Sequence, residues 1–150
     1  TVANFWSYGI RNDPSFVMTN TYAAINNTLQ VRDIDESWLR NSIIHGANGN
    51  EFKLDFNSLA TPNLRFQRTL FRTDQSTTGD FFPEQESIFR NQNPGFRDVS
   101  ARDFRLTSSS FAVNRGSGAL IPFNPLAGID MDGVFRTDGQ PDLGCYEFQP

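Results

Sequence analysis

Apolar residues along this chain of 150 residues occur in short runs that are separated by Asn, Asp, Gly, Ser and Pro. Such runs with frequent turn residues are typical of short β-strands. Helical periodicity is weak throughout. Its best example is the charged stretch 33–40, which is too short to form a stable helix by itself. The pattern therefore predicts an all-β protein.

Three segments repeat one order of residue types: a polar residue, a hydroxyl residue, two apolar residues, and a basic or imidazole side chain. They are 41–46, 68–73 and 86–91. Repeats of one short strand without intervening helices are typical of a solenoid whose strands stack in parallel. We therefore expect the segments around Ile43, Leu70 and Ile88 to be neighbours, with their apolar side chains in one core. An antiparallel β-sandwich with long loops is the alternative.

A solenoid of this kind needs sharp corners between its strands. Gly and Asn tolerate the left-handed backbone conformation that such corners require. The stretch 46–50 contains two Gly and two Asn residues. We expect it to form one of the corners.

Charge and composition exclude several classes of function. The chain has 13 Lys and Arg residues against 17 Asp and Glu residues, a net charge of −4. This balance argues against nucleic acid as a partner, and against a basic helix on a membrane surface. No apolar run approaches the roughly 18 residues of a membrane-spanning helix. The 15 Phe residues supply apolar surface for a substantial core.

Three chemically active residue types occur only once, as His45, Lys53 and Cys145. One Cys excludes an intramolecular disulfide and a Cys-based zinc cluster. Neither Gly-rich phosphate-binding fingerprint is present, and we expect no cofactor. His45 follows two apolar residues in a predicted strand. We therefore expect it to be partly buried and hydrogen-bonded to a neighbouring coil.

The last third of the chain carries a series of short motifs. They are NPGF (93–96), DFRL (103–106), SFAVNRG (110–116), DMDGVFR (130–136) and DLGCYEF (142–148). In this order they resemble the C-terminal module of right-handed parallel β-helix surface lipoproteins of Bacteroidota, of the choice-of-anchor type. The resemblance covers residues 41–148. Phe111, Asn114 and Cys145 depart from the Pro, Asp and Ala of the family pattern, and Asn114 weakens any metal-binding role at its position.

The resemblance implies a right-handed parallel β-helix (a solenoid) over residues 1–92 and an irregular C-terminal closing module of the same domain over 93–150. It implies that the chain is the C-terminal part of a longer protein. That protein would lie on the extracellular face of the bacterial outer membrane, or be secreted, with membrane contact only through a lipid anchor outside this segment.

The function that the resemblance implies is non-enzymatic binding or scaffolding at the outer membrane. Other outer-membrane or envelope proteins, or a polysaccharide, are the expected partners. A carbohydrate-active enzyme of the same fold, a polysaccharide lyase or a glycosidase, is the alternative.

Four acidic residues lie close together in the tail: Asp130, Asp132, Asp138 and Asp142. Calcium binds several carboxylate and carbonyl oxygens, but the spacing of these residues does not match a calcium-binding loop. Asp-Gly dipeptides favour turns, so we expect a structural role and no metal site. We also expect Arg136 to be largely buried and held by at least one of these four carboxylates.

Two groups of charged residues are weaker candidates for catalysis. Paired carboxylates near a basic group serve in glycosidases, and Asp33, Asp35 and Glu36 lie near Arg32 and Arg40. A solvated charged segment explains these residues equally.

The second charged group consists of Lys53 and Asp55, which share one face of a predicted strand. A simple exposed ion pair explains them. We therefore assign no catalytic residue to this chain.

Three aromatic residues outside the Phe pattern have rings that can stack on sugars. They are Trp6, Tyr8 and Trp38. Buried aromatic residues more often fill a core. The sequence therefore leaves the binding residues open.

Overall fold

The computed structural model describes residues 1–6, 8–121, 127–136 and 139–150. This part of the chain holds ten β-strands, two short 3-10 helices and no α-helix. The strands are β1 (Val2–Asn4), β2 (Phe16–Thr19), β3 (Thr21–Ala23), β4 (Leu29–Val31), β5 (Ile34–Gly46), β6 (Phe52–Asp55), β7 (Pro62–Phe71), β8 (Ile88–Arg90), β9 (Phe96–Asp98) and β10 (Asp103–Leu106), and the helices are η1 (Gln85–Ser87) and η2 (Gly118–Leu120). No described helix is long and apolar enough to cross a membrane. The prediction of an all-β protein is confirmed.

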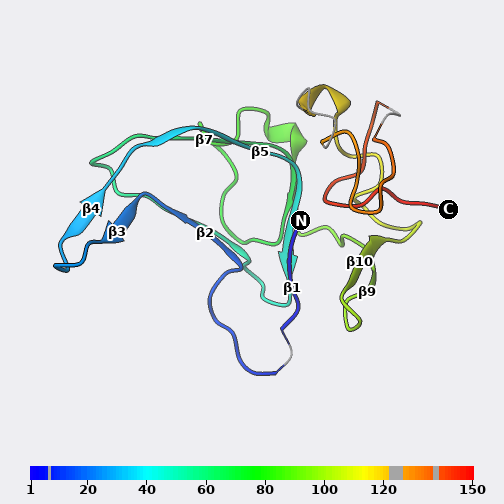
Figure 1. The fold of residues 1–150 in the computed structure, drawn as a ribbon, viewed down its shortest axis with the longest axis horizontal. Coiled ribbons are helices and arrows are strands. Elements are labelled where there is room, and N and C mark those ends of the chain that lie inside the picture. Colours follow the sequence, from blue (N-terminus) through cyan, green and yellow to red (C-terminus); the bar gives the residue numbers. More distant parts are fainter. Residues whose placement is uncertain (7, 122–126, 137–138) are drawn as a thin grey trace.

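Parallel pairing dominates the architecture. The main sheet has the order β1-β5-β7-β8, with every neighbouring pair parallel. Strands β2 and β6 form a second parallel pair. Along the chain, β1 is followed by β2 and β5 by β6, so the backbone passes repeatedly from one parallel sheet to the other. The antiparallel hairpin of β3 and β4 projects at one end of the molecule (Figure 1). The alternative of an antiparallel sandwich is wrong.

The two longest strands bend together at one stacked position. Asn41 in β5 and Arg68 in β7 lie opposite each other, between the paired residues 40–67 and 42–69. Both have positive φ, 46° and 47°, a conformation that turns an extended chain. Figure 1 shows β5 and β7 running side by side and turning sharply together. The corner expected at 46–50 does contain a turn, but none of its residues has positive φ.

The charged stretch 33–40, the best helix candidate of the sequence, belongs to strand β5 from Ile34 onwards. Its backbone pairs with β7 from Ile34 opposite Pro62 to Arg40 opposite Gln67. Pairing with a neighbouring strand satisfies backbone groups that a helix of eight residues would satisfy poorly. Tertiary pairing therefore overrides the weak local preference.

The predicted parallel stacking of the repeated segments is confirmed, but the third repeat is displaced by one residue. Ile43 lies opposite Leu70, and Leu70 lies opposite Phe89 rather than Ile88. Because side chains alternate between the two faces of a strand, a shift by one residue moves a side chain to the other face. Ile88 accordingly packs against a different core from Ile43 and Leu70. The expectation of one shared core is wrong.

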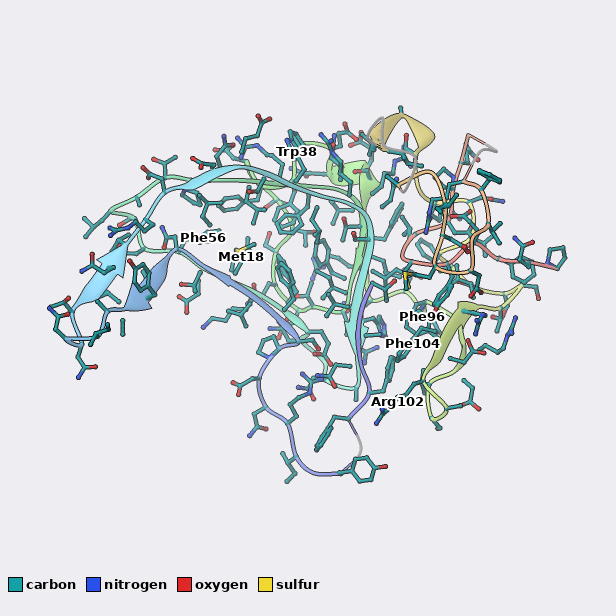
Figure 2. All side chains as sticks on the ribbon, viewed as in Figure 1. Met18, Trp38, Phe56, Phe96, Arg102 and Phe104 are labelled. Carbon is teal, nitrogen blue, oxygen red and sulfur yellow. The ribbon has the colours of Figure 1, made fainter. Side chains whose placement is uncertain are left out.

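Each face of the main sheet covers its own core. The inner core lies between the two parallel sheets and consists of the buried residues Ile44, Phe52, Leu64, Phe66, Phe71 and Phe82. Figure 2 places Met18 and Phe56, which pack against this core, between the two parallel sheets. We call the region 1–92, which contains both sheets, the coil. The outer core lies on the opposite face and consists of Ile43, Leu70, Leu106, Ala112 and Leu143. The C-terminal segment thus covers the outer face of the sheet (Figure 1).

Candidate functional site

A groove of about 720 Å³ lies between the chain that follows β1 and the turn that joins β9 to β10. Its aromatic lining comes from both sides. Phe5, Trp6 and Tyr8 belong to the first side, and Phe104 belongs to the second. Arg102 is the one charged residue among the described lining residues. We call this hollow the aromatic groove.

Phe5 joins the two sides of the aromatic groove through contacts of its ring. Its ring stacks between His45, at 6.1 Å, and Phe104, at 6.3 Å, and meets Phe96 edge-on at 6.0 Å. The ring distances are centroid separations. Buried aromatic contacts of this kind hold a chain segment in one place. Phe5 therefore anchors the described end of the chain that leads from β1 to Trp6.

Trp6 and Tyr8 face the solvent at the mouth of this groove. Trp6 is 56% exposed and Tyr8 is 82% exposed. Their rings meet edge-on with centroids 5.4 Å apart. The Trp6 backbone N–H donates to Asn4 Oδ1 at 3.3 Å. Exposed aromatic rings offer flat apolar faces beside polar edges.

Arg102 lies on the opposite side of the groove, at the turn between β9 and β10. Figure 2 shows it below Phe104, toward the loop that follows β1. The turn is held by Asp98, whose Oδ1 accepts the backbone N–H groups of Ser100 and Ala101 at 2.9 and 3.0 Å. Arg102 itself has positive φ, 59°. Its guanidinium makes no hydrogen bond or ion pair within the described part of the chain.

His45 lies behind Phe5 and is only 6% exposed. Burial is confirmed, but the expected hydrogen bond is not found, because neither ring nitrogen has a partner among the described residues. The pKa of His45 is lowered to about 4, chiefly by burial and also by the positive charge of Arg72, while the charge of Glu51 opposes both effects. The neutral imidazole is thus the form that fits this position.

Trp38 does not join the other two candidate aromatic residues. It lies on β5 and lines a separate hollow of about 610 Å³ beside the C-terminal segment. Figure 2 shows it on the outer side of the bent strands. The Arg40 guanidinium covers its ring at 4.1 Å from the centroid, and Trp38 Nε1 donates to Glu36 at 3.0 Å. One face of this ring is therefore already occupied.

The weaker catalytic candidates are engaged with separate partners. Arg40 Nε donates to Gln67 Oε1 at 3.0 Å, and Asp33 Oδ1 accepts the Thr61 backbone N–H at 2.7 Å. Lys53 Nζ lies 3.1 Å from Asp55 Oδ2, and both side chains are exposed, as expected for a simple ion pair on a strand. None of these residues lines the aromatic groove.

In the acidic tail, two carboxylates bind backbone N–H groups. Asp130 accepts bonds from Asp132 and Val134, both at 2.8 Å, and from Glu147 at 2.7 Å. Asp142 accepts bonds from the backbone of Asn114, at 2.7 Å, and of Phe148, at 2.5 Å. Both Asp residues are buried. These contacts organise turns, and no group of metal-ligating side chains is found within the described residues.

Arg136 is largely buried, with 9% of its side chain exposed. Its guanidinium donates to the Glu147 carboxylate, to the Asp142 carbonyl at 3.2 Å and to the Gly144 carbonyl at 2.9 Å. Glu147 was not among the four predicted partners. Asp142 contributes its backbone carbonyl rather than its carboxylate, and Asp138 lies outside the described residues.

Asp132 binds a different arginine. Arg105 donates to it through Nε and Nη2, at 2.6 and 2.8 Å. These hydrogen bonds lower the pKa of Asp132. Asp132 therefore connects the tail to strand β10 instead of holding Arg136.

Sequence reasoning also missed a buried carboxylate in the coil. Glu51 is fully buried and accepts bonds from both terminal nitrogens of Arg11, from Ser15 and from the Asn48 backbone. Burial alone would raise the pKa of Glu51, but these hydrogen bonds outweigh it, so the pKa is lowered. Gly46 allows this packing, because a Cβ there would lie 2.3 Å from Glu51 Oε1. In the sequence, Glu51 looks like an ordinary turn residue.

No family model, curated protein or solved structure matches this chain.

Proposed function

We propose that residues 1–92 form a right-handed parallel β-helix and that residues 93–150 are its irregular closing module. The support is the repeated register: β1, β5, β7 and β8 stack in parallel, and β2 stacks on β6 from Phe16 opposite Phe52 onwards. The stacked corner of Asn41 and Arg68 adds to this support, since successive coils of a solenoid turn at equivalent positions.

In this proposal the chain is the C-terminal part of a longer protein. Strands β1 and β2 lie at the same open side of their sheets. Most of the large apolar side chains that are exposed among the described residues lie within 1–31. Unpaired strand edges and exposed apolar side chains favour contact with a further coil. A place on the outer membrane, or outside the cell, rests on the C-terminal motif resemblance.

We propose that the chain is a non-enzymatic binding module and that its ligand is a polysaccharide. The observation that carries this proposal is the aromatic groove, where exposed Trp6 and Tyr8 face a guanidinium that has no described partner. The apolar faces of sugar rings stack on aromatic side chains. The hydroxyl groups of the sugar accept hydrogen bonds from donors such as a guanidinium. The groove volume is within the range of about 300 to 1,000 Å³ that is usual for ligand sites.

The same groove favours binding over hydrolysis. Glycosidases use two carboxyl groups, roughly 5 to 9.5 Å apart, on either side of the scissile bond. The described lining residues include no Asp, Glu or His. Our proposal is therefore binding of a polysaccharide without its cleavage.

The test is affinity electrophoresis of the chain in gels that contain single neutral and acidic polysaccharides. We expect at least one polysaccharide to retard the protein, and we expect Trp6→Ala and Tyr8→Ala each to weaken this retardation about tenfold or more. Trp38→Ala is the matched control, because Trp38 lies in the other hollow under Arg40; it should stay within about twofold of wild type. Absence of retardation by every polysaccharide, or an equal loss in Trp38→Ala, would contradict the proposal.

A further inference from the structure

We infer that the aromatic groove is specific for acidic polysaccharides, in which a carboxylate or sulfate group of the sugar binds Arg102 while a ring stacks on Trp6 or Tyr8. This inference rests on the proposed function and adds the chemical class of the ligand to it. Its starting point is the charge of the groove. Arg102 is the only charged residue in the described lining, although the chain as a whole carries a net charge of −4.

The positive charge of Arg102 is not neutralised by its neighbours. The nearest acidic residues along the hairpin are Asp98 and Asp103, and both have other partners. Asp98 accepts two backbone N–H groups of the turn. Asp103 lies 3.1 Å from Arg105 and 3.7 Å from Arg97. An anionic group that enters the groove therefore meets a free guanidinium and no carboxylate in the described lining.

Arg102 also occupies a backbone position that suits another residue better. Its φ of 59° lies in the left-handed region, where a residue with a Cβ is less favourable than glycine. Strained residues of this kind gather at functional sites, because the surrounding structure holds them in place for another purpose. Here the turn between β9 and β10 places a long cationic side chain at the groove.

The chemistry of the guanidinium then selects the ligand. Its planar fork of N–H donors matches the two oxygens of a carboxylate or two oxygens of a sulfate ester. Trp6 and Tyr8 supply the stacking faces on the other side of the groove. A neutral sugar would use the rings but leave the guanidinium without an anion.

The experiment measures binding of the chain to alginate, which carries carboxylates, to dextran sulfate, which carries sulfates, and to neutral dextran. We expect at least one acidic polymer to bind ten times more tightly than dextran, and the two acidic probes show which anion is preferred. Arg102→Gln should reduce that binding at least tenfold. Arg102→Gly should reduce it equally while the melting temperature stays the same or rises, because glycine suits the positive φ.

Arg97→Gln is the matched control. Arg97 lies on the same hairpin, is exposed, and is not part of the groove lining, so its replacement removes the same charge from the same region. Its binding should stay within about twofold of wild type. An equal loss in Arg97→Gln would mean diffuse charge attraction and would overturn the inference.

Two further results separate this inference from the proposed function. If dextran binds as tightly as the acidic polymers and Arg102→Gln changes nothing, the acidic specificity is wrong and polysaccharide binding stands. If no polymer binds, both are wrong.

Discussion

The coil and the C-terminal segment hold their shape in different ways. In the coil, long parallel strands share backbone hydrogen bonds, and four buried Phe rings of the inner core contact one another with centroids 4.4 to 6.4 Å apart. In the C-terminal segment, strands β9 and β10 are short, no strand is found after Leu106 among the described residues, and side-chain carboxylates bind backbone N–H groups instead. The coil depends mainly on apolar packing spread over many residues, whereas the C-terminal segment combines the outer core with a few polar side chains that bind its backbone.

The comparison predicts its largest effect in the inner core. Phe66 is fully buried and contacts Phe52, Phe71 and Phe82. Phe66→Ala should lower the free energy of unfolding by about 3 to 5 kcal/mol, because it removes apolar contacts and leaves a cavity. Phe135→Ala, in the C-terminal segment, is the control and should be nearly neutral, because Phe135 is 71% exposed. Urea denaturation measures both; similar losses would break the comparison.

In the C-terminal segment the largest effect should come from a charged residue. Arg136→Ala leaves the buried Glu147 carboxylate without its guanidinium and should cost about 3 kcal/mol, toward the lower end of the range for broken buried pairs. It should not change polysaccharide binding, because Arg136 does not line the aromatic groove. Lys53→Ala removes an exposed pair and should cost at most about 1 kcal/mol. An unchanged melting temperature in Arg136→Ala would contradict this account.

Acid should weaken the junction between the two regions through His45, whose backbone pairs with β1 and whose ring stacks on Phe5, which in turn contacts Phe96 of the C-terminal hairpin. Its pKa is about 4 in the folded chain and 6.5 when unfolded. Between these values the unfolded chain binds more protons, so stability falls as the pH is lowered from about 7 toward 4, and this group has little effect above about pH 7.5. From pH 7 to 5 the loss should approach about 2 kcal/mol, since the slope reaches about 1.36 kcal/mol per pH unit once the unfolded histidine is fully protonated.

The control for this pH dependence is His45→Phe, which fills the same space without a titratable group. Its free energy of unfolding, followed by urea denaturation between pH 7 and 5, should depend less on pH than that of wild type. The difference between the two pH profiles isolates the contribution of His45. It removes the contribution of Glu51, whose lowered pKa also makes the fold less stable in acid. Parallel pH profiles for the two proteins would show that His45 does not titrate at this junction.

The smallest effects should distinguish the two residues of the stacked corner. Asn41 exchanges hydrogen bonds with the Ser117 backbone, at 3.0 Å to the carbonyl and 2.9 Å from the N–H. Asn41→Gly keeps the positive φ but loses these bonds, at a cost of about 1 to 2 kcal/mol. Arg68→Gly loses no such contact and should be neutral or stabilising by about 1 kcal/mol. The melting temperature should therefore fall for Asn41→Gly, and it should stay the same or rise for Arg68→Gly.

Local pattern gave good predictions where local physics dominates. Short apolar runs with frequent turn residues indicated short strands, and the repeat of hydroxyl and apolar residues indicated parallel stacking of the segments at Ile43 and Leu70. The Asp-Gly stretches of the tail indicated turns, and Asp130 does accept the backbone bonds of such a turn. Burial of Arg136 followed from the same reasoning.

The errors arose where partners come from distant parts of the chain. The one-residue displacement of Ile88 depends on how the chain between β7 and β8 is accommodated, which no local pattern records. Arg136 binds Glu147 because the last residues fold back beside it, and Glu51 is buried because Arg11 reaches it from a separate loop. From the sequence alone, Glu147 and Glu51 could equally have been exposed surface residues.

The sequence by itself determined an all-β chain with parallel repeats, a Phe-rich interior and a tail of polar turns. Only the tertiary structure decided that the sheet has two cores, that Trp6, Tyr8 and Arg102 line one groove, and that Trp38 lies elsewhere. The physical reason is that alternation and turn preference act over a few residues. The groove instead forms where residues 3–6 and residues 99–104, far apart in the chain, are brought together by packing of Phe5 on Phe104.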